Sequence, residues 1–225
     1  LEAGLVFAGY GIEADELQHN DYAKLDVEGK VVVQFAGQPH DFPSEEGAHF
    51  ASSTEKTKAA VRHGAVGIIT IHTPRASQRY QWDRLSNRVG MPSMGWINGQ
   101  GEVHGDFDQI RGGAMLRHTA ASPLFEGAPV NLETLIERDD SGEALTTFEL
   151  DGRVIMRQRS THENISSPNV VAVLPGSDPL LAGEYVVYSA HLDHIGELHP
   201  DVSDHESKDR INNGALDNAS GISVM

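Results

Sequence analysis

Residues 184–196 read EYVVYSAHLDHIG, and residues 214–221 read GALDNASG. Within the first stretch, residues 185–190 form a short apolar run of the kind that makes a buried β-strand. The run ends just before His191, so we expect this imidazole where a strand gives way to a loop. In open α/β sheets, ligands bind outside the carboxyl ends of the strands. The stretch therefore predicts an α/β fold with a candidate site at the end of this strand.

Three residues of these two stretches are candidates for a metal centre. Alternate side chains of an extended backbone share a face, so His191 and Asp193 should project to the same side. A metal-bound imidazole needs a partner on its other ring nitrogen, and a carboxylate two residues on can help to organise such a site. Asp217 precedes a run of small residues that predicts a helix start, with Asn218 or Ser220 as candidate caps. A carboxylate at Asp217 could bridge two cations.

The strings SAHLDHIG and NGALDNASG resemble the metal-binding motifs of the co-catalytic zinc exopeptidases. That family includes secreted bacterial leucine aminopeptidases, glutamate carboxypeptidase and the transferrin receptor. The resemblance implies a site with two zinc ions, in which His191 ligates one zinc, Asp217 bridges both, and Asp193 is the catalytic-support carboxylate. Two motifs in this order are more specific than a lone His-x-Asp pair.

The resemblance also implies that part of the site is outside this chain. The family completes its site with a Glu-Glu pair, an Asp and a His, all after the bridging Asp, whereas this sequence ends at Met225. It begins with Leu1, directly before a strand-like run. We therefore expect a fragment of a longer enzyme, without the general base and inactive by itself.

The first third of the chain predicts a compact βαβ element. Three apolar runs predict strands, at residues 5–12, 30–37 and 65–71. Ser52 and Glu55 have capping-box spacing and open a predicted helix that runs through Arg62. Gly64 should end this helix in the left-handed conformation.

Residues 21–23, 26–32 and 64–69 resemble the protease-associated domain, which this family often carries ahead of the His-x-Asp motif. We expect a short strand at 91–97, a loop over the acidic residues 137–143, strands at 154–159 and 169–174, and a turn at 175–179. The predicted fold class is α/β, α+β overall: a β-rich protease-associated domain over residues 1–155, followed by the truncated start of an αβα-sandwich zinc-peptidase domain over residues 156–225.

The amino-acid composition limits the kinds of molecule that this chain is expected to bind. Seventeen basic and thirty-three acidic residues give a net charge of −16, which disfavours nucleic acid and anionic lipid as partners. No apolar run is long enough to span a bilayer. Because the chain has no cysteine, His and carboxylates are the strong metal ligands it offers. The family resemblance suggests a secreted, periplasmic or cell-envelope protein, and the sequence gives no signal for an oligomeric state.

Several alternatives stay open at this stage. His199 and His205 lie in a charged run that we interpret as a solvated loop. His194 should point away from His191 and pack or hydrogen-bond rather than ligate. An aminopeptidase that acts on peptide substrates is the first hypothesis. A non-catalytic receptor or binding module on the same fold is the second, and a carboxypeptidase or cyclase of the same family is the third.

Overall fold

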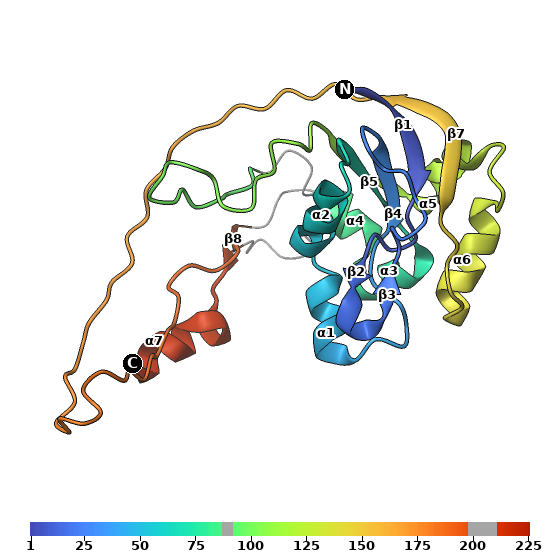
Figure 1. Ribbon diagram of the computed structural model, residues 1–225. Helices are drawn as coiled ribbons and strands as arrows, with labels where there is room; N and C mark the ends of the chain where they lie inside the picture. Colours follow the sequence, from blue (N-terminus) through green and yellow to red (C-terminus); the bar gives the residue numbers. More distant parts are fainter. Residues whose placement is uncertain (87–91, 198–210) are drawn as a thin grey trace. The chain divides into compact units, whose positions relative to one another are not determined.

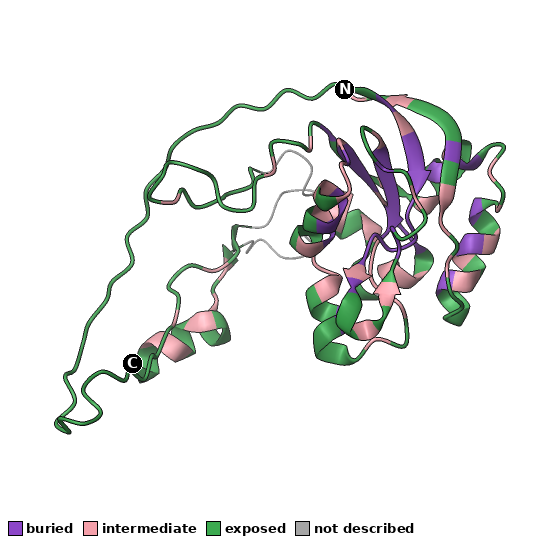
Figure 2. Cartoon of the chain, viewed as in Figure 1, coloured by how far each residue is buried: buried purple, intermediate pink, exposed green. Residues whose placement is uncertain are grey.

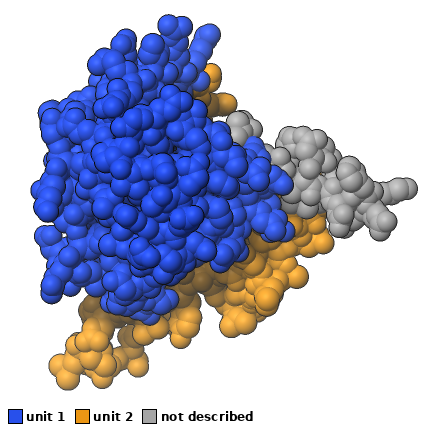
Figure 3. Space-filling view, turned by 90° about the vertical axis from the view of Figure 1, so that its right-hand side faces the viewer, with its two compact units in different colours: residues 1–159 blue, residues 160–225 orange. Residues whose placement is uncertain are grey.

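The computed structural model describes residues 1–86, 92–197 and 211–225. The chain divides into two compact units, Leu1–Arg159 and Ser160–Met225, which Figure 3 shows in different colours. Strands and helices both contribute, as expected for an α+β fold. None of the helices in the described ranges is long and apolar enough to cross a membrane.

A five-stranded sheet organises unit 1 (Figure 1). Its strands, in spatial order, are β6 (Gly113–Arg117), β5 (Gly67–His72), β4 (Val31–Phe35), β1 (Glu2–Phe7) and β7 (Phe148–Ile155). The first four are parallel, and β7 runs antiparallel to β1. The three strands predicted in the first third are therefore present. The predicted first strand, 5–12, ends early because Gly9 and Gly11 turn the chain with φ values of 54° and 69°.

Helices and short turns connect the strands. They are η1 (Asp15–Leu17), α1 (Ser44–Phe50), α2 (Ser53–Arg62), α3 (Pro74–Arg79), α4 (Trp82–Ser86), α5 (His118–Ala121), η2 (Ser122–Phe125) and α6 (Leu132–Ser141), with the small hairpin β2 (Glu13–Ala14) and β3 (His19–Asn20). The predicted start of α2 is confirmed, because the Ser52 hydroxyl accepts the Glu55 amide at 3.3 Å. The predicted stop is also confirmed, since Gly64 has a φ of 80°.

Two apolar clusters lie on opposite faces of the sheet, because successive side chains of a strand alternate between faces. Phe7, Val33 and Ile71 belong to the cluster that also contains Leu135 of α6. On the other face, residues that include Val6, Val32 and Ala60 pack together, the last from α2. Figure 2 colours most of β1, β4 and β5 as buried. The carboxyl ends of β1, β4 and β5 consequently open on one edge of the sheet.

Three expectations for this unit need correction. The acidic run 137–143 is not a loop: residues up to Ser141 belong to α6, whose N-cap Asn131 accepts the Thr134 amide at 2.8 Å. The predicted strand at 154–159 extends only to Ile155, the end of β7. Of the predicted strand 91–97, residue 91 lies outside the described ranges, and Ile97 forms only an isolated bridge with Val103.

In unit 2, the described ordered elements cluster near the second motif. They are β8 (Gly196–Glu197), β9 (Ile211–Asn212), the turn η3 (Ala215–Ala219) and α7 (Ser220–Val224). The runs 169–174 and 185–190, predicted as strands, are in no strand of the described chain. A strand needs a neighbour to pair its amides, and neither run has one among the described residues. Their side chains are exposed, with Val170 at 94% and Val186 at 83%.

Candidate metal centre

The short ladder of β8 and β9 brings the two motifs together. Gly196 pairs with Asn212 and Glu197 with Ile211 in antiparallel register. The Asn212 side chain adds a hydrogen bond to the Gly196 carbonyl at 3.2 Å. The first motif immediately precedes β8 and the second follows β9, so this pairing sets His191 beside Asp217. His199 and His205, interpreted from the sequence as part of a solvated loop, lie outside the described residues.

His191 and Asp217 form the closest side-chain pair of the site. The His191 Nε2 atom lies 3.0 Å from the Asp217 Oδ1 atom. Both side chains remain open to solvent, with exposed fractions of 47% and 69%. Asp217 has a non-helical backbone, with φ −118° and ψ 87°, at a kink inside η3. The kink separates it from the regular helix and leaves its carboxylate accessible.

Asp193 supports His191 chiefly through its main chain. Its carbonyl oxygen contacts the His191 Nδ1 atom. The Asp193 carboxylate is farther away, with Oδ1 at 3.7 Å from Nδ1, and its side chain is 95% exposed. The pKa of His191 is raised, first because the Asp193 carbonyl accepts from the ring and then because the Asp217 and Asp193 carboxylates favour its protonated form. The contact to the imidazole thus comes from the main chain of Asp193, and the supporting role of its carboxylate stays a prediction.

The run of small residues after Asp217 predicted a helix start, and α7 begins there, at Ser220. The Asn218 Oδ1 atom accepts the Gly221 amide at 2.9 Å. The Ser220 hydroxyl instead donates to the Leu216 carbonyl at 2.7 Å. The N-cap position itself is Ala219, so Asn218 accepts an amide of the first turn from one residue before the cap.

The donor set suits zinc in type and spacing. Bonds of about 2.0–2.2 Å to nitrogen and oxygen set two tetrahedral zinc ligands roughly 3.3 Å apart. The 3.0 Å between Nε2 and Oδ1 is close to that separation. Within the described ranges, no group of three or more His, Asp or Glu side chains is arranged to hold a metal ion. His191 and Asp217 therefore fit as two members of a metal site that needs further ligands.

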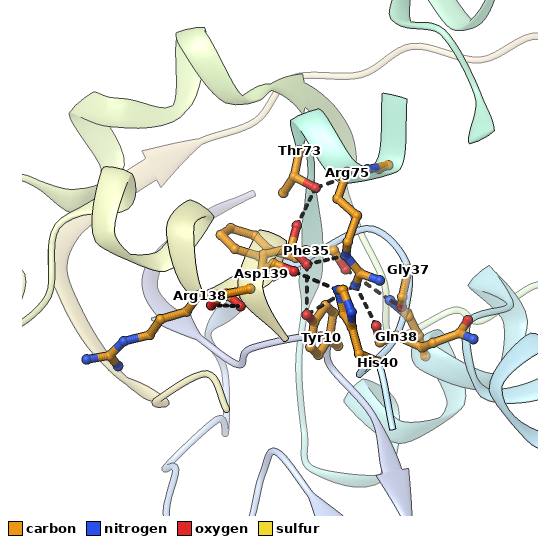
Figure 4. Close-up of polar contacts among 12 residues, drawn as sticks. Tyr10, Phe35, Gly37, Gln38, His40, Thr73, Arg75, Arg138 and Asp139 are labelled. Atoms are coloured by element: carbon orange, nitrogen blue, oxygen red, sulfur yellow. Dashed lines mark hydrogen bonds and ion pairs between the residues drawn. The ribbon is translucent and has the colours of Figure 1, made fainter. Parts of the chain in front are cut away.

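A second polar cluster, in unit 1, is the obvious rival site (Figure 4). The buried Asp139 carboxylate accepts from Tyr10 at 2.7 Å, Thr73 at 2.6 Å and Arg75 at 2.8 Å. Three donors thus fill both of its oxygens. The His40 Nε2 atom also lies 2.9 Å from the Asp139 carbonyl oxygen. We interpret this cluster as structural: it links the ends of the strands to α6. Both oxygens of the Asp139 carboxylate already accept hydrogen bonds and the side chain is buried, so no position is left for a ligand.

Sequence reasoning missed this cluster and gave His194 no specific partner. Asp139 follows Leu132 and Leu135 at helical spacing, which could have signalled a buried helix face. For His194, the Nδ1 atom lies 3.7 Å from the Asp217 Oδ2 atom. No local signal predicts that contact, because it depends on how the two motifs meet.

Comparison with known proteins gives one match, to a family model. The family model of Peptidase family M28 matches residues 169–225. No curated protein and no solved structure matches the chain. The matched segment contains His191, Asp193 and Asp217, and it lies wholly within unit 2. The match is confined to residues 169–225, and this segment is similar to peptidase family M28, a family of zinc-dependent metallopeptidases.

Proposed function

We propose that this chain supplies part of the catalytic domain of a two-zinc aminopeptidase that removes N-terminal residues from peptides. The observation that carries the proposal is the 3.0 Å convergence of His191 Nε2 and Asp217 Oδ1 inside the segment that matches M28. His191 and Asp217 would hold zinc, and Asp193 would support the imidazole.

The chain prepares His191 for this role. A ring whose Nδ1–H donates to the Asp193 carbonyl keeps its lone pair on Nε2, the atom that faces Asp217. Asp217 supplies negative charge on an exposed carboxylate with two oxygens, which suits a bridge between two cations. When bound, zinc polarises a carbonyl and activates water near neutral pH.

The charges of unit 2 favour an aminopeptidase over a carboxypeptidase. Residues 160–225 contain ten Asp and Glu side chains but only two cationic side chains, Lys208 and Arg210. The carboxylates in the described ranges are those of Glu163, Asp178, Glu184, Asp193, Glu197 and Asp217. A peptide α-amine is largely cationic near neutral pH, whereas a C-terminal carboxylate needs a cationic partner. The excess of carboxylates in unit 2 can therefore attract the first kind of chain end, whereas only two cationic side chains are available to the second.

The test uses the natural protein that carries this segment. We expect about two zinc ions per protein in the two-metal arrangement. Peptides with a free N-terminus and an amidated C-terminus should be hydrolysed, and their N-acetylated counterparts should not. Hydrolysis of the acetylated peptides from their C-terminal end would instead establish a carboxypeptidase.

The 225-residue chain by itself should behave differently. Two converging donors leave an open coordination sphere, so we expect weak zinc binding that chelators reverse, and no hydrolysis of aminoacyl-nitroanilides. Robust hydrolysis by the purified chain would contradict this part of the proposal.

We further propose that unit 1 is an accessory domain of the protease-associated type. Its βαβ segment and its self-satisfied polar cluster support a structural role without chemistry of its own. Limited proteolysis of the chain should cut within residues 160–195, where the described backbone has no helix or strand, and should leave unit 1 intact. Early cleavage between β4 and β5 would contradict an independently stable unit 1.

A further inference from the structure

We propose that His194 is a positioning residue that holds the Asp217 carboxylate in the orientation that faces His191. The inference rests on the proposed metal centre and adds a residue to it. The two oxygens of Asp217 are flanked by two different imidazoles. Oδ1 lies 3.0 Å from His191 Nε2, and Oδ2 lies 3.7 Å from His194 Nδ1. Each oxygen of the carboxylate therefore has one imidazole beside it, while the side chain stays 69% exposed.

Burial distinguishes the two imidazoles. The His194 side chain is 21% exposed, compared with 47% for His191. A group that binds a metal needs one open side, whereas a group that fixes its neighbour can be enclosed. His194 has the enclosed position.

The turn before Asp217 is shaped around the His194 ring. Gly214 has a φ of 64°, and a Cβ atom there would lie 2.7 Å from the His194 Cβ and 2.9 Å from its Cγ. Only a residue without a side chain allows so close an approach. Glycine at 214 thus lets the imidazole pack directly on the turn that carries Asp217, and the same contact fixes where the ring can lie.

The contact acts by restricting motion. A separation of 3.7 Å is too long for a direct hydrogen bond, so the His194 ring limits the space into which the Asp217 Oδ2 atom can turn. An exposed Asp side chain otherwise loses rotational freedom when it binds a metal. Holding the carboxylate in advance lowers that cost and strengthens metal binding. His194 thereby acts on the metal through Asp217 without touching it.

The experiment measures metal affinity in the full chain. Zn²⁺ binding is followed by competition with a chromophoric chelator, and Co²⁺ binding by visible absorbance, with far-UV circular dichroism as a check on folding. His194→Leu should weaken binding about tenfold to hundredfold without changing the number of bound ions. His194→Asn sets an amide nitrogen near the position of Nδ1 and should restore most of the affinity. His162→Leu replaces an exposed histidine of the same unit and should change nothing.

A measurement without metal covers the possibility that His194→Leu disturbs folding. In the metal-free chain, the ring signals of His194 in a ¹H–¹³C spectrum should move on Asp217→Ala and not on Asp178→Ala. Unmoved His194 signals would overturn the proposed contact.

The variants also separate this inference from the metal centre itself. If Asp217→Ala keeps full metal affinity, the proposed centre is wrong and the role of His194 fails with it. If Asp217→Ala loses the metal while His194→Leu stays within twofold of the unchanged chain, the centre stands and the positioning role is wrong. If His194→Asn loses a bound ion as His191→Ala does, His194 is a ligand, which also overturns positioning.

Discussion

Asp139 in unit 1 and Asp217 in unit 2 are the same side chain in opposite settings. Asp139 is fully buried, and donors at 2.6–2.8 Å fill both of its oxygens. Asp217 is 69% exposed and faces two imidazoles at 3.0 and 3.7 Å. A carboxylate whose acceptor positions are filled and enclosed stabilises a fold, whereas one with open positions can bind a cation. The comparison teaches that solvent access and unfilled acceptors, rather than residue type, distinguish the two roles.

The largest effect should come from Asp139→Ala. The change leaves Arg75 beside buried polar groups without its carboxylate, and breaking a buried pair of this kind costs about 3–5 kcal/mol. Denaturant unfolding of the full chain should show the loss, and amides of β4 and β5 should exchange faster. Asp140→Ala, one residue along the same helix and exposed, is the matched control. Equal losses for the two variants would contradict the structural role of Asp139.

Asp217→Ala should impair metal binding and leave the stability of unit 1 unchanged, the converse of Asp139→Ala. Metal binding and peptidase activity in the natural protein should disappear, because the shared carboxylate is lost, while the unfolding of unit 1 should not change. His191→Ala should weaken one ion preferentially. Asp193→Asn should cost only about tenfold, because the Asp193 carbonyl remains in contact with His191. Zinc content measured beside kcat/KM decides these rankings, and a loss of unit 1 stability on Asp217→Ala would contradict the separation of roles.

A third prediction concerns the buried Lys56, whose ammonium donates to the Phe35 carbonyl at 3.0 Å and to the Gly37 carbonyl. Burial lowers the pKa of Lys56 from 10.5 to about 7. Between about pH 7 and 10.5 the unfolded chain therefore binds more protons than the folded chain at this residue. The contribution of Lys56 to stability should rise with pH across that window, by up to about 1.4 kcal/mol per pH unit, and should be constant well below pH 7.

Comparing the full chain with Lys56→Met isolates this contribution. Urea unfolding at pH 7 and pH 9 should show a larger gain for the unchanged chain than for the variant. The measurements stop at pH 9 because burial also raises the pKa of Tyr10. At about pH 10 the unfolded chain loses the tyrosine proton while the folded chain keeps it, so the contribution of Tyr10 to stability falls as pH rises. Parallel pH profiles for the two proteins would show that Lys56 has an ordinary pKa in the fold.

The same contrast explains what could be predicted from sequence. Strands β1, β4 and β5 and helix α2 follow from apolar runs and a local capping pattern. Helix α6 had equally local signals, in Asn131 and in Gly142 with its φ of 80°, but the acidic composition led to the wrong prediction. The runs 169–174 and 185–190 have strand-type sequences, yet strand formation depends on pairing partners that no local pattern supplies.

The sites divide in the same way. The two motifs predicted His191 and Asp217 as metal ligands, and the structure places the His191 Nε2 atom 3.0 Å from the Asp217 Oδ1 atom. The contacts of Asp139 join residues 129 and 66 positions apart, so spacing along the chain gives no sign of them. The contact between His194 and Gly214 likewise depends on a left-handed glycine in a different motif.

The smallest effect should come from Ser52 and Asn218, whose side chains each accept an amide at the start of a helix. Ser52→Ala removes the acceptor of the Glu55 amide in unit 1 and should cost about 1 kcal/mol of unfolding free energy, since α2 packs on the sheet core. Asn218→Ala removes the acceptor of the Gly221 amide, but α7 buries no residue, so the unfolding of unit 1 should not change. Amide exchange should locate the second effect at Gly221. Because the first turn of α7 adjoins Asp217, metal affinity should fall modestly on Asn218→Ala and stay constant on Ser52→Ala. The reverse pattern would show that the site depends on unit 1 and would remove the contrast between the two regions.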